Sequence, residues 1–189
     1  MNYYIADYHF FHKNVTAEGT NIDNRPFKTM DEMMDIFRGK WIETGITYRD
    51  DVFFIGDLCW KEGDLAVELI SSLPGNKYLV RGNHDRCKNQ GYTGLFKDIS
   101  PYADINDSGR RLILCHYPIA FWNAQHRGSI HLYGHVHNSV EELLYQKFLS
   151  RLDFSVRAYN VGCMMPYMNW SPQTLDTIIT RADMYYGRV

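Results

Sequence analysis

The stretch DVFFIGD (residues 51–57) runs from a continuous apolar segment directly into a glycine and a carboxylate. Its first five residues are typical of a strand that is buried on both faces, as in a parallel sheet between helices. A second stretch, KYLVRGNHD (residues 77–85), has the same design, with an apolar run followed by Asn83, His84 and Asp85. Ligands of α/β sheets bind where the strands end. The two stretches therefore predict an α/β fold with polar side chains gathered at one edge of a sheet.

Short apolar runs alternate with helical patterns along the rest of the chain. The further strands predicted from β-rich runs are residues 2–7, 111–115, 130–133 and 156–161. The helices predicted from apolar periodicity are residues 29–44, 64–73 and 139–152. This alternation indicates a layered α/β fold, and no repeat, linker or low-complexity tract divides it. We therefore expect a single domain that spans residues 1–189.

Helix starts are marked by residues that cap free backbone N–H groups. Thr29 with Glu32, and Ser139 with Glu142, have the spacing of capping boxes and predict two helix N-termini. The dipeptide Ser-Pro at residues 171–172 is expected to start a last short helix, because proline is favoured at the first helical position.

Composition and charge argue against several classes of protein. The chain has 20 basic and 22 acidic residues, so no basic surface is indicated, and a nucleic-acid partner is not favoured. No apolar stretch approaches the roughly 20 residues that span a bilayer, and the N-terminus does not resemble a secretory signal. The 4 cysteines form no C-x-x-C pair and are expected to be free thiols in a reducing compartment. We expect a cytoplasmic protein without a membrane partner.

Five of the apolar runs end directly in side chains that bind metals. These side chains are Asp7, His9, Asp57, Asn83, His84, Asp85, His116, His135 and His137. Each motif alone is better explained by a polar turn or another structural role, but five such motifs at strand ends predict a metal centre. The mixture of carboxylate, amide and imidazole donors suits Mn, Fe, Zn or Ni better than Ca or Mg. Glycines precede three of the motifs, which is consistent with tightly packed backbone beneath a metal: Gly56, Gly82 and Gly134.

The order of these motifs resembles that of the calcineurin-like metallophosphoesterase superfamily. The matching series is Asp7-x-His9, Gly56-Asp57, Gly82-Asn83-His84-Asp85, His116 and Gly134-His135-x-His137. The start of the chain also resembles a smaller bacterial and phage branch, whose first block continues through His12, Asn14 and Arg25-Pro26-Phe27. Phe11 departs from the pattern, because a glycine is expected at this position.

The resemblance implies a four-layer αββα sandwich that holds two divalent transition-metal ions. The implied ligands of the first metal are Asp7, His9 and His137. The implied ligands of the second metal are Asn83, His116 and His135. Asp57 would bridge the two ions, for which manganese is the first expectation and iron, nickel or zinc are the alternatives.

The implied activity is hydrolysis of a phosphate ester of a small substrate, either a monoester or a diester, by a hydroxide that bridges the metals. His84, which follows ligand Asn83, is expected to protonate the leaving oxygen, and Asp85 to orient His84. His12 and Arg25 are candidates for contact with the substrate. A structural role is equally open for His12 and slightly favoured for Arg25.

Two other functions stay open at this stage. A nuclease would need a basic or aromatic-lined channel, which the near-neutral charge does not favour. A non-catalytic scaffold would be expected to lack the proton donor or several histidines, whereas all of them are present. His126 and His131 belong to no motif and are interpreted as surface or core histidines. Cys59 and Cys115 are near ligands in the sequence but match no family ligand.

Overall fold

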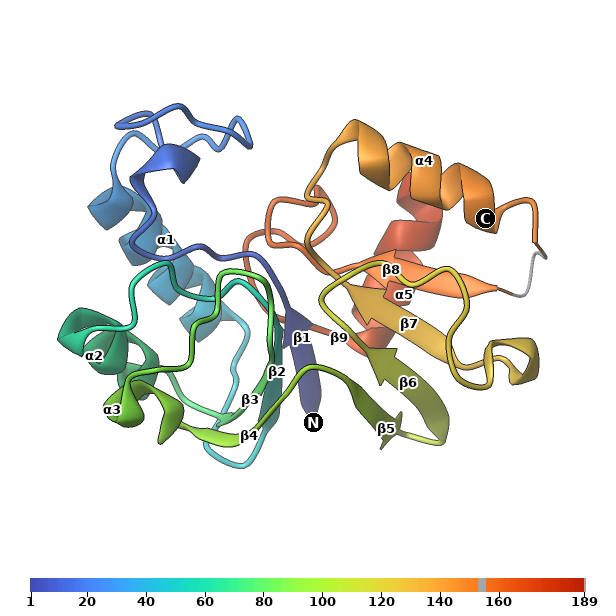
Figure 1. Cartoon of the computed structure of the whole chain (residues 1–189), viewed down its shortest axis with the longest axis horizontal. Coiled ribbons are helices and arrows are strands. Elements are labelled where there is room, and N and C mark those ends of the chain that lie inside the picture. Colours follow the sequence, from blue (N-terminus) through green and yellow to red (C-terminus); the bar gives the residue numbers. More distant parts are fainter. Residues whose placement is uncertain (153–155, 189) are drawn as a thin grey trace.

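Two mixed β-sheets form the centre of this computed structural model, which describes residues 1–152 and 156–188 (Figure 1). The first sheet has the strand order β4-β3-β2-β1-β9. Its strands are β1 (Asn2–Ile5), β2 (Asp51–Ile55), β3 (Asn76–Val80), β4 (Phe96–Ser100) and β9 (Gln173–Thr174). The second sheet has the order β5-β6-β7-β8. Its strands are β5 (Ala103–Asp107), β6 (Arg110–Leu114), β7 (Ile130–Tyr133) and β8 (Arg157–Asn160).

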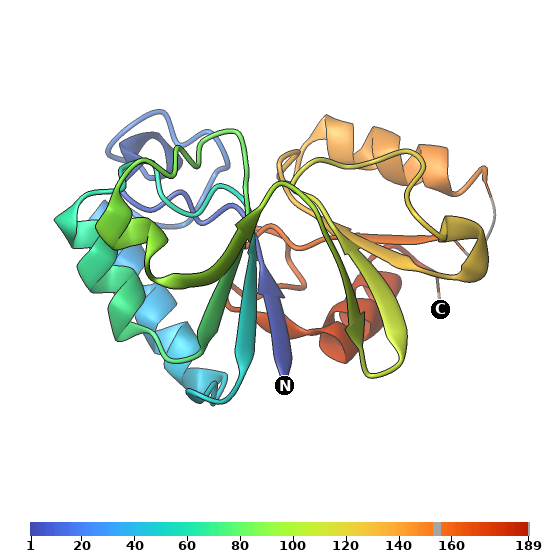
Figure 2. The same cartoon turned by 60° about the horizontal axis from the view of Figure 1, so that its bottom comes forward.

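Helices cover the outer sides of both sheets. The helices are α1 (Met30–Glu43), α2 (Asp64–Ser72), α3 (Gln90–Thr93), α4 (Val140–Leu149) and α5 (Leu175–Tyr185), with 3₁₀ turns η1 (Lys13–Val15) and η2 (Gln125–Arg127). Figure 2 shows α1, α2 and α3 beside the first sheet and α4 beside the second. Helix α5 contacts both β1 and β8 and therefore lies where the sheets approach each other. The expected α/β sandwich is confirmed.

Parallel pairing explains why β2 is a continuous apolar run. β2 pairs in parallel with β1 on one side and with β3 on the other, and helices and the second sheet cover its two faces. Phe53 stacks on Tyr4 and Tyr78, with ring centroids 5.5 and 4.7 Å apart. Its neighbour Phe54 stacks on Trp41 of α1 at 5.8 Å. Burial of each such ring stabilises the fold by about 1.5–3 kcal/mol.

Helix α1 begins where its capping residues predict. Thr29 Oγ accepts a hydrogen bond from the backbone N–H of Glu32 at 3.1 Å. The Glu32 carboxylate in turn accepts the N–H of Lys28 at 2.6 Å. Two backbone N–H groups at the start of the helix thus have side-chain partners. Met33 and Phe37 are spaced one turn apart and are buried against the sheet.

The predicted capping box of α4 is wrong in one of its two residues. Ser139 does cap the helix, but it accepts the N–H of Glu141 at 3.1 Å. The side chain of Glu142 is buried instead, where it accepts hydrogen bonds from Tyr133 and Asn160. Helix α4 also ends at Leu149, before the predicted residue 152.

The expected helix start at residues 171–172 is also wrong. Gln173 and Thr174 pair antiparallel with β1 as strand β9, which removes them from helical geometry. Helix α5 therefore begins at Leu175, where Thr174 accepts the N–H of Thr177 at 3.4 Å. Among the described residues, no helix combines the length and the apolar composition that crossing a membrane requires.

Candidate metal centre

The loops after five strands converge at one edge of the two sheets. The predicted ligands follow β1, β2, β3, β6 and β7, at the carboxyl ends of these strands. Two groups have ligand atoms within 4.8 Å of one another: Asp7, His9 and His137 in one group, and Asp57, His116 and His135 in the other. Each group is able to hold a metal ion.

Asp57 lies between the two groups, and Asn83 joins the second. Asp57 Oδ2 is 3.4 Å from His116 Nε2 and 3.7 Å from His9 Nε2. Asn83 Oδ1 is 3.1 Å from His116 Nε2 and 2.9 Å from His135 Nδ1. The structure therefore brings all the predicted ligands into one cluster.

Two predicted histidine ligands, His116 and His137, already use Nδ1 in a hydrogen bond. The Nε2 atom of each ring is the one left to bind a metal ion. His116 Nδ1 lies 2.9 Å from the carbonyl oxygen of Ile55, and His137 Nδ1 lies 2.5 Å from Asp23 Oδ1. Both partners are acceptors, so Nδ1 carries the proton, and the neutral ring has its lone pair on Nε2. Metal-binding histidines commonly have such a carboxylate or carbonyl partner. Sequence reasoning missed Asp23, because it lies in a long loop rather than at a strand end.

The Nε2 atoms of these rings face nitrogen and oxygen atoms of other predicted ligands. His137 Nε2 is 3.1 Å from His9 Nε2, and His116 Nε2 faces the side-chain oxygens of Asn83 and Asp57. Where both facing atoms present lone pairs, they repel unless a proton or a cation lies between them. Carboxylate, amide oxygen and imidazole together are a suitable donor set for divalent transition metals. The residues present therefore fit a metal centre.

The pKa values of the cluster show that positive charge is favoured beside Asp57. Burial raises the pKa of Asp57, but the hydrogen bond and charge of His116 outweigh burial and bring it to about 2. Burial lowers the pKa of His116, but Asp57 and Asp7 raise it to about 9. Burial dominates at two other residues, where it raises the pKa of Asp7 and brings the pKa of His9 well below its usual range. A proton or a metal ion supplies the favoured charge.

Most of the predicted ligands stand on strained backbone. Residues in the left-handed region, with φ between 50° and 72°, are Asp7, His9, Asp57, His135 and His137. A non-glycine residue in a sparsely populated conformation costs about 1–3 kcal/mol and persists only where the surroundings hold it. Such residues cluster at functional sites, so the backbone geometry and the side-chain cluster point to the same edge of the sheets.

Two glycines let the backbone approach the ligands closely. A Cβ atom on Gly82 would overlap the carboxylate and the backbone N–H of Asp57. A Cβ atom on Gly134 would lie 2.5 Å from Asp7 Oδ2. Gly56 packs in the same way against the ring of His116. The glycines quoted from the motifs thus pack directly against predicted ligands.

His84 lies at the open side of the cluster. Its side chain is 37% exposed, and its Nε2 is 3.9 Å from Asp57 Oδ2. Its backbone N–H donates to Asp57 Oδ1 at 2.9 Å, which ties the loop after β3 to the loop after β2. The ring packs against Trp60, with centroids 4.7 Å apart. Trp60 was not singled out in the sequence, because no motif contains it.

Asp85 does not orient His84 as expected. Its buried carboxylate accepts three backbone N–H groups, from Asp57 at 2.8 Å, Leu58 at 3.1 Å and Gly82 at 2.8 Å. No hydrogen bond joins it to the His84 ring among the described residues. Asp85 instead holds the loop that carries Asp57, and a local sequence motif cannot distinguish these two roles.

Arg25 is buried and does not face the open side of the cluster. Its guanidinium donates to the carbonyl oxygens of Asp7 and Tyr8, each at 2.8 Å. It also pairs with Asp23 at 2.7 Å, and its side chain is fully buried. Arg25 therefore has the structural role, because it fixes the loop after β1 and the carboxylate that bonds His137.

His12 lies near the cluster but outside both groups of ligands. Its ring stacks on Trp60 with centroids 4.0 Å apart and an interplanar angle of 24°. The preceding Phe11 has a φ of 65°, which explains why a glycine is expected at its position. His131 is buried in the core, and His126 is exposed on η2. All the cysteines are free.

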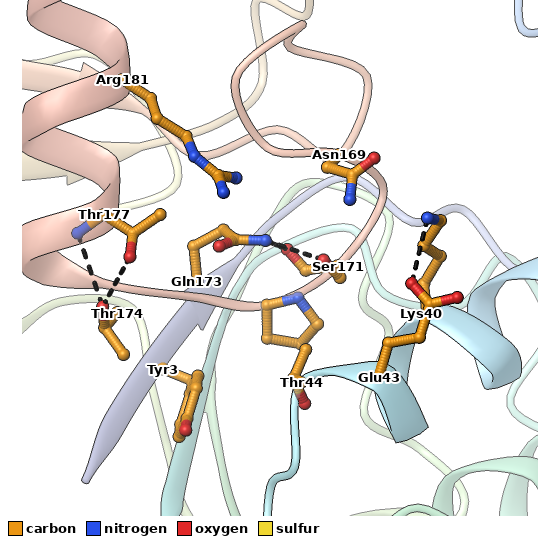
Figure 3. A pocket seen from close by; sticks show the side chains of 11 residues that line it. Tyr3, Lys40, Glu43, Thr44, Asn169, Ser171, Gln173, Thr174, Thr177 and Arg181 are labelled. Carbon is orange, nitrogen blue, oxygen red and sulfur yellow. Dashed lines mark hydrogen bonds and ion pairs between the residues drawn. The ribbon is translucent and has the colours of Figure 1, made fainter.

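A cavity of about 290 Å³ lies at the other end of the first sheet (Figure 3). It is lined by Tyr3 of β1, the end of α1 and the start of α5, and Figure 3 shows Arg181 and Asn169 pointing towards it. Its lining includes none of the predicted ligands. The metal centre and this cavity are therefore separate features.

Comparison with solved structures supports the fold. No family model matches the chain. An uncharacterized protein of Methanocaldococcus jannaschii is 26% identical over 180 residues, which cover 94% of this chain and 88% of that protein. A solved structure from Aquifex aeolicus, a protein of unknown function, has a TM-score of 0.71 at 22% identity and covers 95% of this chain and 98% of its own.

A phosphoesterase of E. coli, YfcE, has a TM-score of 0.40 at 16% identity, and the match covers 71% of this chain and 69% of YfcE. A similarity this weak says nothing about the function of this chain. The similarity to the Aquifex aeolicus protein shows the α/β sandwich alone. The candidate metal centre is the feature of the chain that bears on its function. That centre consists of two adjacent groups of Asp and His side chains at the strand ends, each able to hold a metal ion.

Proposed function

We propose that the chain hydrolyses phosphate esters with two divalent transition-metal ions. The observation that supports this most is the position of Asp57 between two groups of metal donors. A single structural site would need one closed set of ligands. Two sets that share a carboxylate suit paired ions, and paired ions are typical of phosphoester hydrolysis.

The residues divide into a set for each ion and a bridge. Asp7, His9 and His137 would hold one ion. Asn83, His116 and His135 would hold the other. Asp57 would bridge them. When bound, such a pair of ions supplies Lewis acidity towards phosphate oxygens and lowers the pKa of water.

The protein's own contribution is positioning and proton transfer. Asp23 and the carbonyl of Ile55 hold the rings of His137 and His116 in the tautomer that presents Nε2. His84, outside both groups and exposed, donates a proton to the oxygen that leaves the phosphorus. The near-neutral charge of the chain favours a small phosphate monoester or diester over a nucleic acid as the substrate.

Hydrolysis of p-nitrophenyl phosphate and of bis-p-nitrophenyl phosphate tests the proposal. We expect the chelator-treated protein to be inactive and to recover with Mn, Fe, Ni or Zn, and the preferred ester to distinguish a monoesterase from a diesterase. Asp57→Asn should lower metal content and activity together. His84→Ala should keep the metal and lose about 100- to 10,000-fold in kcat with an alkyl ester.

His126→Ala is the matched control, because His126 is an exposed histidine on η2 without a metal-ligand neighbour. It should keep both metal content and activity. A purified protein that binds no divalent metal and gains no activity from any of the four ions would overturn the proposal. A metal-loaded protein without hydrolysis would instead indicate a binding scaffold.

A further inference from the structure

The orientation of the His84 ring is decided by packing. Among the described residues, its ring nitrogens make no hydrogen bond, and the 3.9 Å between Nε2 and Asp57 Oδ2 is too long for one. The ring lies 4.7 Å from Trp60 at an angle of 45°, and 5.5 Å from the ring of His9. Asp85, the neighbour expected to orient the ring, accepts hydrogen bonds from backbone N–H groups instead.

Trp60 is itself held in place from two directions. Its backbone N–H donates to the carbonyl oxygen of Phe10 at 2.9 Å, and the neighbouring Cys59 forms a β-bridge with Phe10. The loops after β1 and β2 are thus joined beneath the indole. The ring of His12 stacks on the indole at 4.0 Å with an interplanar angle of 24°. The backbone hydrogen bond and the stacked His12 ring therefore restrain the indole beside the open edge of the candidate metal centre.

We propose that Trp60, supported by His12, is the positioning residue that holds the His84 ring in place for proton donation. The inference rests on the proposed function, in which His84 is the proton donor. A proton donor must come within about 2.6–3.2 Å of the oxygen it protonates. A misplacement of about 1 Å can cost about 100-fold in rate. A partly exposed imidazole without a hydrogen bond needs a rigid neighbour to avoid that loss.

The dependence of the rate on the leaving group tests this role. An alkyl alcohol needs a proton to leave, whereas p-nitrophenolate leaves readily without one. We expect Trp60→Ala in the metal-loaded protein to lower kcat for an alkyl phosphate by about 10- to 100-fold. The loss for p-nitrophenyl phosphate should be much smaller, and KM should change little for either ester. Trp60→Phe, which keeps a flat ring, should recover most of the activity with the alkyl ester.

Tyr48→Ala is the control, because Tyr48 is 77% exposed and precedes β2 at the opposite end of the strand from Asp57. It should leave both rates unchanged. A double-mutant cycle with His84→Ala then separates action through His84 from direct action. If Trp60 acts through His84, Trp60→Ala should cause no further loss in the His84→Ala background. The same fold-loss in both backgrounds, or an equal loss for both esters, would overturn the inference.

A measurement without turnover separates this inference from the proposed function. In the zinc-loaded protein, NMR should show ring protons of His84 shifted upfield by the neighbouring indole, and Trp60→Ala should abolish that shift. Unshifted ring protons in the wild-type protein would refute the positioning role, whatever the activity. Failure of the wild-type protein to hydrolyse any ester would refute the proposed function, while an indole-dependent shift would still support the packing.

Discussion

At the scale of single residues, the metal centre combines strained backbone with side chains that have little freedom. Asp7 and Asp57 both have positive φ angles and lie against glycines that leave no room for a Cβ atom. Tight packing of this kind is what keeps a costly conformation populated. Phe11 shares the positive φ without being a predicted ligand, so it allows the strain to be measured without disturbing the metals.

Phe11→Gly should be more stable than Phe11→Ala. Both variants lose the packing of the ring, but only alanine keeps a Cβ atom at a φ of 65°. We expect glycine to be favoured by about 1–2 kcal/mol in urea unfolding of the metal-free protein. The control variants are Tyr48→Gly and Tyr48→Ala. Tyr48 has no positive φ, so glycine should not be favoured there. Equal stability of the two Phe11 variants would show that the strain is relieved elsewhere.

Asp23→Asn should weaken metal binding without removing a ligand. The Asp23 carboxylate lies 2.5 Å from His137 Nδ1 and fixes the ring, and loss of such a partner typically costs about 10- to 100-fold in metal affinity. Competition with a chromophoric chelator measures the change. Asp35→Asn, at an exposed position on α1, is the control and should bind metal as the wild-type protein does.

At the scale of elements, α4 is joined to the second sheet and to α5 by a buried carboxylate. Glu142 Oε1 accepts hydrogen bonds from Tyr133 at 2.9 Å, Gln146 at 2.9 Å and Tyr186 at 2.6 Å. Its Oε2 accepts from Asn160 at 3.0 Å, and Asn160 also donates to the carbonyl oxygen of His137 at 2.9 Å. The network therefore connects the loop after β7, which carries predicted metal ligands, to helices α4 and α5.

Glu142→Gln should destabilise the protein. The introduced NH₂ group would face donors, so at least one buried donor would lose its partner, at about 1–3 kcal/mol for each. Urea unfolding measures the loss. Glu141→Gln, next to it on the exposed side of α4, should change stability by less than about 0.5 kcal/mol. A neutral effect of Glu142→Gln would contradict this role of the buried network.

The second sheet also contains a buried histidine that links stability to pH. His131 Nδ1 bonds the carbonyl oxygen of Ile113 at 2.9 Å, and burial lowers the pKa of His131 to about 4. The unfolded chain therefore binds more protons than the folded chain between about pH 6.5 and 4, and stability falls as the pH falls through this range. The expected loss from pH 7 to pH 5 is about 2 kcal/mol. His131→Asn should remove that part of the pH dependence of urea unfolding.

At the scale of the whole molecule, the candidate metal centre lies where loops of the two sheets meet. The loops after β1, β2 and β3 of the first sheet meet the loops after β6 and β7 of the second. Metal ions bound there would cross-link parts of the chain that are distant in sequence, and ligands that bind only the folded state stabilise it. Metal binding and folding are therefore expected to be coupled.

Metal removal should lower the stability of the whole molecule. With free metal at about 100 times its dissociation constant, the stabilisation is about 2.7 kcal/mol for each site. Differential scanning calorimetry with and without EDTA measures it. The metal-dependent rise in Tm should be lost in Asp57→Asn, whereas His126→Ala should keep it. A wild-type Tm that does not respond to metal would contradict the coupling.

The metal donors and the main strands could be predicted from the sequence because their signals are local. Apolar runs such as 51–55 and 130–133 mark buried parallel strands, and the residue after a strand end must lie at the edge of a sheet. The polar strands β4 and β5 lack such a run and were not predicted. The start of α5 was misplaced because pairing of β9 with β1 overrides the local preference of proline.

The partners of those donors were decided only by the tertiary structure. Asp23 bonds His137 across 114 positions of the sequence, and Trp60 lies beside His84 through a contact between loops. The roles of Asp85 and Arg25 depend on which backbone groups come within about 3 Å of them. Donor chemistry is a property of residue type and strand position, so the sequence determined it. Orientation depends on contacts between distant segments, and only the folded chain brings these together.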